Sequence, residues 1–139
     1  MILIISDYHH RENKVLDLIE KYHPDRIFCL GDSESEMWFL DQNNILAVKG
    51  NCDYIDLPIN RIIEVDGKRF LLTHGHQYGV RFSLDRLYYL ALENKADYVL
   101  YGHTHYQKLE IIDGITFLNP GALLNDKYAL YEDGKITLY

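Results

Sequence analysis

Five short apolar runs, each about the length of a buried strand, are followed directly by residues that can bind cations. The runs are rich in β-branched and aromatic residues, which favours strands over helices at this length. They cover residues 2–5, 26–30, 45–48, 69–73 and 98–101. In layered α/β proteins the ligand crevice lies beyond the carboxyl ends of the strands. The pattern therefore predicts that five loops converge on one polar site.

The residues after these runs are histidine, aspartate and asparagine. They are Asp7 and His9, Asp32, Asn51 and Asp53, His74 and His76, and His103 and His105. Taken singly, Gly31-Asp32 is an ordinary turn, and an Asp-x-His pair is an ordinary loop sequence. With His10, which follows His9, six of the seven histidines nevertheless fall in three of these groups. The joint pattern therefore indicates a metal centre more strongly than any one motif does.

The segments between the early runs have helical periodicity. Residues 12–22 place Val15, Leu16, Leu18 and Ile19 on one apolar stripe, which ends before Pro24. Ser33 is expected to cap a short helix through residue 40, and Ser83 to cap a helix to about residue 94.

Later in the chain, Asp-Gly pairs separate short apolar segments. Such pairs stand at 66–67, 113–114 and 133–134, and each predicts a two-residue hairpin. Strands joined by helices come first and hairpins follow, which predicts an α/β fold with mixed sheets.

Length and charge limit the function classes. A chain of 139 residues fits one domain, expected over residues 1–139. The net charge of −7 argues against binding to duplex nucleic acid or to an anionic membrane, since both require a basic surface. No run approaches a membrane span or the core of a signal peptide. The two cysteines, Cys29 and Cys52, form no CxxC pair, so a reducing compartment is expected, with the cytoplasm as the default.

The types of the candidate ligands indicate which cation they suit. Imidazole, carboxylate and amide groups suit Mn, Fe, Zn, Co or Ni, and the absence of a cysteine cluster argues against a structural zinc site. More ligands are present than one ion needs, which suggests two ions that share a carboxylate. Two ions about 3.5–4 Å apart serve in-line displacement at phosphorus.

In this order, the motifs resemble those of the calcineurin-like metallophosphoesterases. They are Asp7-x-His9, Gly31-Asp32, Gly50-Asn51-x-Asp53, His74 and Gly102-His103-x-His105. Cys52, His74-Gly75-His76 and Asn119-Pro120-Gly121 resemble the small prokaryotic phosphodiesterase subfamily. The resemblance implies a four-layer αββα sandwich with two mixed β-sheets flanked by helices and a dimetal site at the edge of the sheets.

The resemblance also implies the division of ligands between two ions. One ion would be held by Asp7, His9, Asp32 and His105. Asp32 would bridge to a second ion, which is also held by Asn51, His74 and His103. Manganese is the expected metal, with Ni, Fe, Zn or Co as alternatives, and hydroxide on the metals is the expected nucleophile.

Three residues near the motifs have two interpretations each. Many relatives carry His where this chain has Cys52. Cys52 is expected to be catalytic but a poorer proton donor, which favours diesters over monoesters; alternatively, it is a small loop residue. His76 is expected to contact the phosphate or to have a structural role. His10 either lines the pocket or faces solvent.

The expected function is metal-dependent hydrolysis of a small phosphodiester, which can be a nucleotide, by a protein that can form a homo-oligomer. Arg11, Lys49 and Arg81 lie near the motifs and are candidates to pair with phosphate. One alternative is a catalytically silent scaffold, because relatives with this fold have lost metal ligands and catalysis. Another is a binding domain with a single metal ion.

Overall fold

The computed structural model describes residues 1–139 and contains two five-stranded sheets. The first sheet consists of β1 (Ile2–Ile5), β2 (Arg26–Cys29), β3 (Ile45–Ala47), β9 (Ala129–Glu132) and β10 (Lys135–Leu138). The second consists of β4 (Asn60–Val65), β5 (Lys68–Thr73), β6 (Tyr98–Leu100), β7 (Lys108–Ile112) and β8 (Ile115–Asn119). The helices are α1 (Glu12–Tyr22), α2 (Met37–Gln42) and α3 (Asp85–Glu93), with 3-10 turns η1 (His76–Tyr78) and η2 (Leu123–Asn125).

Both sheets are mixed. Their strand orders are β10-β9-β1-β2-β3 and β4-β5-β6-β8-β7. In the first sheet β1, β2 and β3 are parallel, and β9 is antiparallel to β1. In the second sheet β5, β6 and β8 are parallel, whereas β4 and β7 pair antiparallel at the two edges.

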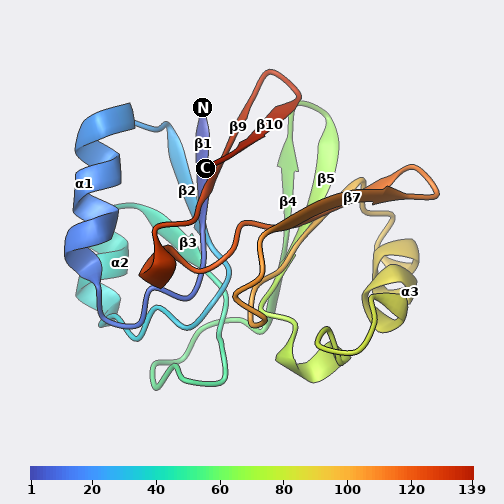
Figure 1. The fold of residues 1–139 in the computed structure, drawn as a ribbon, viewed down its shortest axis with the longest axis horizontal. Coiled ribbons are helices and arrows are strands. Elements are labelled where there is room, and N and C mark those ends of the chain that lie inside the picture. Colours follow the sequence, from blue (N-terminus) through green and yellow to red (C-terminus); the bar gives the residue numbers. More distant parts are fainter.

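The layers follow the order helix, sheet, sheet, helix. Figure 1 shows α1 and α2 on the outer side of the first sheet and α3 on the outer side of the second. The predicted αββα sandwich is therefore confirmed. None of the helices has the length and apolar composition that crossing a membrane would require.

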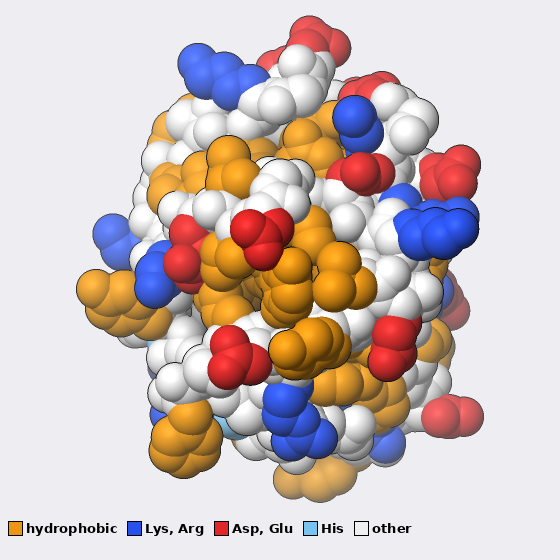
Figure 2. All heavy atoms as spheres, turned by 90° about the vertical axis from the view of Figure 1, so that its right-hand side faces the viewer, with side chains coloured by type: hydrophobic (Ala, Val, Ile, Leu, Met, Phe, Trp, Pro, Cys, Tyr) orange, Lys and Arg blue, Asp and Glu red, His pale blue; other side chains and the backbone are white.

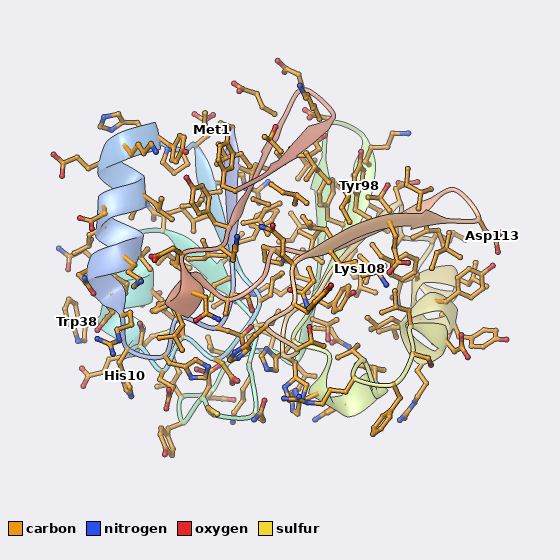
Figure 3. All side chains as sticks on the ribbon, in the orientation of Figure 1. Met1, His10, Trp38, Tyr98, Lys108 and Asp113 are labelled. Atoms are coloured by element: carbon orange, nitrogen blue, oxygen red, sulfur yellow. The ribbon has the colours of Figure 1, made fainter.

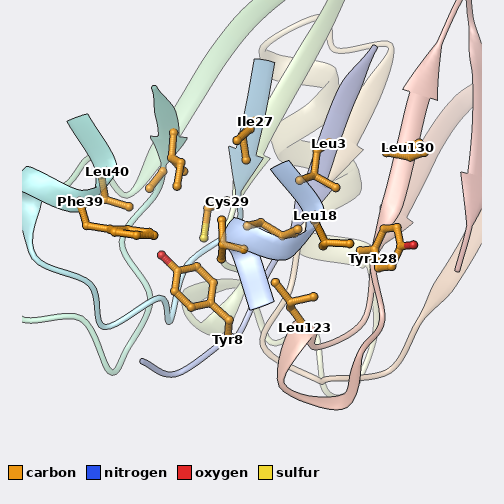
Figure 4. Close-up of a cluster of buried hydrophobic side chains, with 14 of the residues drawn as sticks. Leu3, Tyr8, Leu18, Ile27, Cys29, Phe39, Leu40, Leu123, Tyr128 and Leu130 are labelled. Carbon is orange, nitrogen blue, oxygen red and sulfur yellow. The ribbon is translucent and has the colours of Figure 1, made fainter. Parts of the chain in front are cut away.

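Buried apolar side chains fill each gap between the layers. One cluster lies under α1 and α2, and Figure 4 shows Leu18 of α1, Cys29 of β2 and Phe39 of α2 within it. A second cluster, including Phe28 and Phe70, lies between the sheets. Burying one such side chain stabilises the fold by about 1.5–3 kcal/mol. Cys29 is fully buried, as its position in an apolar run predicts.

The register of the parallel strands positions the loops that carry the motifs. Ile5 is level with Cys29, and Cys29 is level with Ala47. In the second sheet Leu72 is level with Leu100. The loops after β1, β2, β3, β5 and β6 therefore leave the two sheets at one edge, which is the lower edge in Figure 1.

Three details of the predicted helices are wrong. Ser33 does not cap α2, which begins at Met37; instead, the Oγ of Ser33 accepts a hydrogen bond from the Ser35 amide at 3.2 Å. Leu16 of α1 is 46% exposed, so the buried stripe of this helix is narrower than predicted. Ser83 does not cap α3 either, because Leu84 holds the N-cap position.

Candidate metal centre

Three predicted ligands gather where the loops after β1 and β6 meet. Asp7, His9 and His105 place one potential ligand atom each within 4.8 Å of one another. The Oδ1 atom of Asp7 is 3.2 Å from Nε2 of His105 and 3.9 Å from Nε2 of His9. These atoms form the first ligand group.

A second ligand group lies beside the first. Asp32, His74 and His103 also place ligand atoms within 4.8 Å of one another. Asn51 joins them, because its Oδ1 lies 3.0 Å from Nε2 of His74 and 3.1 Å from Nδ1 of His103. The structure thus brings together all seven side chains that the sequence nominates as metal ligands.

Asp32 and His74 are the members of the second group that approach the first group. Nε2 of His74 is 3.2 Å from Oδ2 of Asp32 and 3.9 Å from Oδ1 of Asp7. Asp32 also forms a cluster of potential ligands with His9 and Cys52. This placement agrees with a bridging role for Asp32, although that role stays a prediction.

Two buried atoms at the centre, Oδ1 of Asp7 and Nε2 of His74, are better placed to bind a cation than to bind each other. Oδ1 of Asp7 is buried and makes no hydrogen bond, although the imidazoles of His9, His74 and His105 lie within 3.9 Å of it. In His74, Nδ1 is 2.6 Å from the Leu30 carbonyl, so it carries the proton and donates it. When His74 is neutral, its Nε2 lone pair therefore faces the oxygens of Asp32 and Asn51. A divalent cation would satisfy these converging lone pairs.

The backbone at the centre is held in the left-handed region. The φ angles are 54° at Asp7, 43° at His9, 54° at Asp32, 70° at His103 and 63° at His105. Such a conformation costs about 1–3 kcal/mol per residue, and it persists where the surrounding structure fixes it. Five of the seven candidate ligands therefore stand on a backbone that is constrained to present them.

Two glycines let the loops approach closely. A Cβ atom at Gly50 would lie 2.1 Å from Oδ1 of Asp32, and one at Gly102 would lie 2.7 Å from Oδ2 of Asp7. Any side chain at these positions would displace the carboxylate beside it. The Gly-Asn and Gly-His motifs thus provide space as well as ligands.

Asp53 ties the loop after β3 to the loop after β2. Its buried carboxylate accepts hydrogen bonds from the amides of Asp32 (2.9 Å), Glu34 (2.8 Å) and Gly50 (2.7 Å). Asp53 therefore orients the backbone that presents Asp32.

Asn119 has the same role for the loop after β6. Its Nδ2 donates to the Gly102 carbonyl at 3.2 Å and to Oγ1 of Thr104 at 2.9 Å. The Asn119-Pro120-Gly121 motif therefore supports the loop that carries His103 and His105.

The pKa values reflect burial and close charges. Burial alone would raise the pKa of Asp32, but the hydrogen bond and the charge of His74 lower it to about 2. Burial lowers the pKa of His74, but Asp32 and Asp7 raise it by more, so the net shift is upward. Burial and the neighbouring His74 and Arg81 lower the pKa of His103 to about 4. Asp32 is thus ionised and His103 neutral at pH 7, as metal ligands must be.

The two predicted catalytic residues lie beside the ligands. The Cys52 amide donates to Oδ1 of Asp32 at 2.8 Å, and burial together with the nearby carboxylates raises the thiol pKa to about 11. His76 places its ring centroid 5.4 Å from that of His74, and its buried Nδ1 has no hydrogen-bond partner. Their catalytic roles stay predictions.

His10 lies outside the centre. Its side chain is 65% exposed, and its Nε2 is 3.5 Å from Oε1 of Glu34. Figure 3 shows His10 at the lower edge of the molecule, beside the start of α1. The structure supports the solvent-facing interpretation of this residue.

Glu34 supports the centre although it is not among the predicted site residues. Its Oε2 lies 2.9 Å from Nδ1 of His9, which leaves Nε2 of His9 to face Asp7. A carboxylate behind an imidazole fixes the ring and its tautomer at metal sites. An acidic residue two positions after a predicted ligand is the available signal, but a helix capped by Ser33 would place Glu34 in its first turn instead.

Known proteins share both the sequence and the fold. Residues 1–131 match the sequence model of the calcineurin-like phosphoesterase superfamily domain. The chain is 33% identical over 125 residues to the probable metallophosphoesterase YsnB of Bacillus subtilis, which covers 88% of this chain and 74% of that protein. It is 32% identical over 90 residues to phosphodiesterase YfcE of Escherichia coli, or 58% of this chain and 45% of that protein.

Solved structures of other proteins have the same fold as this chain. A predicted phosphoesterase from Streptococcus pneumoniae superposes with a TM-score of 0.84 at 27% identity, covering 99% of this chain and 95% of that one. Vps29 of Entamoeba histolytica complexed with zinc superposes with a TM-score of 0.78 at 25% identity, covering 99% and 89%. From the family match, the relatives and the shared fold, this chain belongs to the calcineurin-like phosphoesterase superfamily.

Proposed function

We propose that this protein is a metal-dependent phosphodiesterase that hydrolyses a small phosphodiester at a centre of two divalent ions. The observation that carries the proposal is the pair of adjacent ligand groups, Asp7-His9-His105 and Asp32-His74-His103. Each group has the size and chemistry of a site for one cation. The phosphodiesterase name of the relative YfcE supports the same activity.

In this proposal Asp7, His9, Asp32 and His105 hold one ion, and Asp32, Asn51, His74 and His103 hold the other. Manganese is the preferred candidate, and Ni, Fe, Zn and Co suit the same ligands. When bound, such a pair would lower the pKa of water to about 7 and offset negative charge on the phosphoryl oxygens.

The residues of the chain would orient the substrate and control its protons. His76 is the candidate for a phosphoryl contact, because its Nδ1 is buried without a partner close to His74. Cys52 is the candidate to face the leaving group. Its thiol pKa of about 11 in the metal-free protein makes it a weak proton donor at pH 7. The proposal therefore favours diesters with good leaving groups over monoesters.

The substrate would be a small phosphodiester, with a nucleotide among the candidates. The net charge of −7 disfavours duplex nucleic acid. We also propose that residues 1–139 form one domain. The protein would form a homo-oligomer and would be located in the cytoplasm.

A scaffold is the competing function, because a vacuolar protein sorting protein, Vps29, has the same fold. A scaffold does not require intact metal ligands. This chain retains all seven candidate ligands in two compact groups, which favours the enzyme.

Metal-dependent hydrolysis of bis(4-nitrophenyl) phosphate tests the proposal. We expect chelated protein to be inactive and restored Mn²⁺ to recover activity. Asp32→Ala and His74→Ala should abolish that activity, whereas the exposed Asp17→Ala and His23→Ala should retain it. Equal rates with and without metal would refute the enzyme and favour the scaffold.

A further inference from the structure

A groove of about 470 Å³ lies beside the candidate metal centre, between the loop before α3 and strand β7. Pockets for small ligands have volumes of about 300–1,000 Å³, with apolar walls and a few polar groups. The floor here includes Val80 and Tyr101, which are buried, and Ile112, which is partly buried. The groove thus has the size and lining of a ligand pocket.

Arg81 and Thr104 connect this groove to the metal centre. Both line the groove, and Thr104 stands between His103 and His105 in the sequence. Nε of Arg81 donates to Nε2 of His103 at 3.0 Å. Nδ1 of the same ring faces Asn51 at 3.1 Å, within the second ligand group. A single imidazole ring therefore separates the groove from the centre.

The rim of the groove carries two large aromatic side chains that the core does not use. Phe82 is 93% exposed and Tyr106 is 72% exposed. Figure 2 views the face of the molecule toward α3, where hydrophobic side chains gather with charged ones around them. Exposed rings beside a polar centre can stack on a planar ligand.

The charges in the groove balance. Arg81 and Lys108 are cationic, whereas Asp85 and Glu110 are anionic. Nζ of Lys108, labelled in Figure 3 at the start of β7, lies 3.4 Å from Oε1 of Glu110. The groove therefore offers little net charge to a ligand. Arg81 is the cationic group at the end of the groove that meets the centre.

We propose that this groove binds one ester group of the phosphodiester, and that this group is an uncharged aromatic ring, such as an aryl group or a nucleobase. The inference rests on the proposed function and specifies the substrate class of that site. The continuity with the centre, the two exposed rings and the balanced charge all support an aromatic group over a sugar phosphate or a peptide.

Arg81 would contact the phosphoryl group at the junction. Neutral imidazole has one protonated nitrogen, so Nε2 of His103 can accept from Arg81 only while the proton is on Nδ1. If Nδ1 faces a cation, Nε2 carries the proton and no longer accepts. The guanidinium is then free to pair with a phosphoryl oxygen, for which its geometry is suited.

Binding of two phosphonates to the Mn²⁺-loaded protein tests the proposal. Methylphosphonate and benzylphosphonate share the phosphoryl group, resist hydrolysis because of the P–C bond, and differ in the aromatic ring. By calorimetry, we expect benzylphosphonate to bind about tenfold more tightly, the gain expected for one stacked ring. Tyr106→Ala and Phe82→Ala should each remove much of this preference. Tyr89→Ala, which removes an exposed aromatic side chain of α3 outside the groove, should retain it.

The remaining outcomes separate a failure of the groove proposal from a failure of the proposed function. Equal affinity for both phosphonates in the wild type, or a preference that survives both groove variants, would overturn the groove proposal and leave the proposed function intact. If neither phosphonate binds to protein shown to hold metal, both proposals fail. A wild-type dimer that Tyr106→Ala dissociates, with the phosphonate preference unchanged, would show that a second copy occupies the groove instead.

Discussion

Nε2 of His74 lies 3.2 Å from Oδ2 of Asp32, while Nδ1 of the same ring is committed to the Leu30 carbonyl at 2.6 Å. The imidazole therefore has one direction left in which to bind, and that direction is toward the centre. In the metal-free protein a proton on Nε2 reconciles the two side chains, which raises the pKa of His74 even though burial opposes the rise.

The affinity for metal should depend on pH through His74. Because its pKa is raised, His74 keeps its proton to a higher pH than an ordinary histidine, and a cation must displace that proton in order to bind. Affinity should therefore fall as pH falls through this pKa, by about tenfold per unit for one proton. His103, with a pKa of about 4, adds a loss only in stronger acid. Titration with Mn²⁺ at pH 6, 7 and 8 measures how the affinity changes with pH. An affinity that stays the same over this range would mean that His74 is not a metal ligand.

Glu34→Gln should weaken metal binding without unfolding the protein. The carboxylate orients His9 through a contact of 2.9 Å, and loss of such a partner lowers metal affinity by about 10- to 100-fold. Calorimetry with Mn²⁺ measures the change, and the exposed Glu20→Gln is the matched control. An affinity equal to that of the wild type would mean that His9 needs no such support.

Asp53→Ala should destabilise the fold as well as the centre. It would leave the amides of Asp32, Glu34 and Gly50 without their acceptor. We expect a loss of at least about 2 kcal/mol in the free energy of unfolding, since each unsatisfied buried donor costs about 1–3 kcal/mol. Urea unfolding of the metal-free protein measures it, with the exposed Asp56→Ala as control. A change below about 0.5 kcal/mol would show that water replaces the carboxylate.

Cys52→His should increase hydrolysis of an aryl phosphomonoester. The thiol has a pKa of about 11, whereas an imidazole titrates near neutral pH and is a better proton donor. We expect at least about a tenfold rise in kcat, given that general acid catalysis contributes about 10²–10⁴-fold. Cys52→Ala separates the two interpretations of the residue. A rate unaffected by both substitutions would identify Cys52 as a loop residue with no part in catalysis.

Local sequence was sufficient to predict the strands, the hairpins and the convergence of the motifs. Nearby residues alone indicate the strand at residues 2–5 and the turn at Asp66-Gly67, and β1 and the β4–β5 hairpin are confirmed. The parallel order of β1, β2 and β3 then places their loops together, as expected of strand ends in layered folds.

The start of α2 and the role of Glu34 depend on contacts that local sequence does not reveal. Glu34 has a φ of 55°, and its amide donates to Asp53, nineteen residues away in the sequence. That long-range contact replaces the helical turn that Ser33 and Glu34 would favour on their own. The position of Arg81 against His103 likewise depends on how the loop after η1 folds over the second sheet.

Anomalous diffraction from crystals grown with Mn²⁺ would show directly whether the centre holds two ions. We expect two peaks about 3.5–4 Å apart. One should lie among Asp7, His9 and His105 and the other among Asp32, His74 and His103, with Asp32 touching both. A single peak, or none at these side chains in crystals that contain the metal, would rule out a centre of two ions at this site.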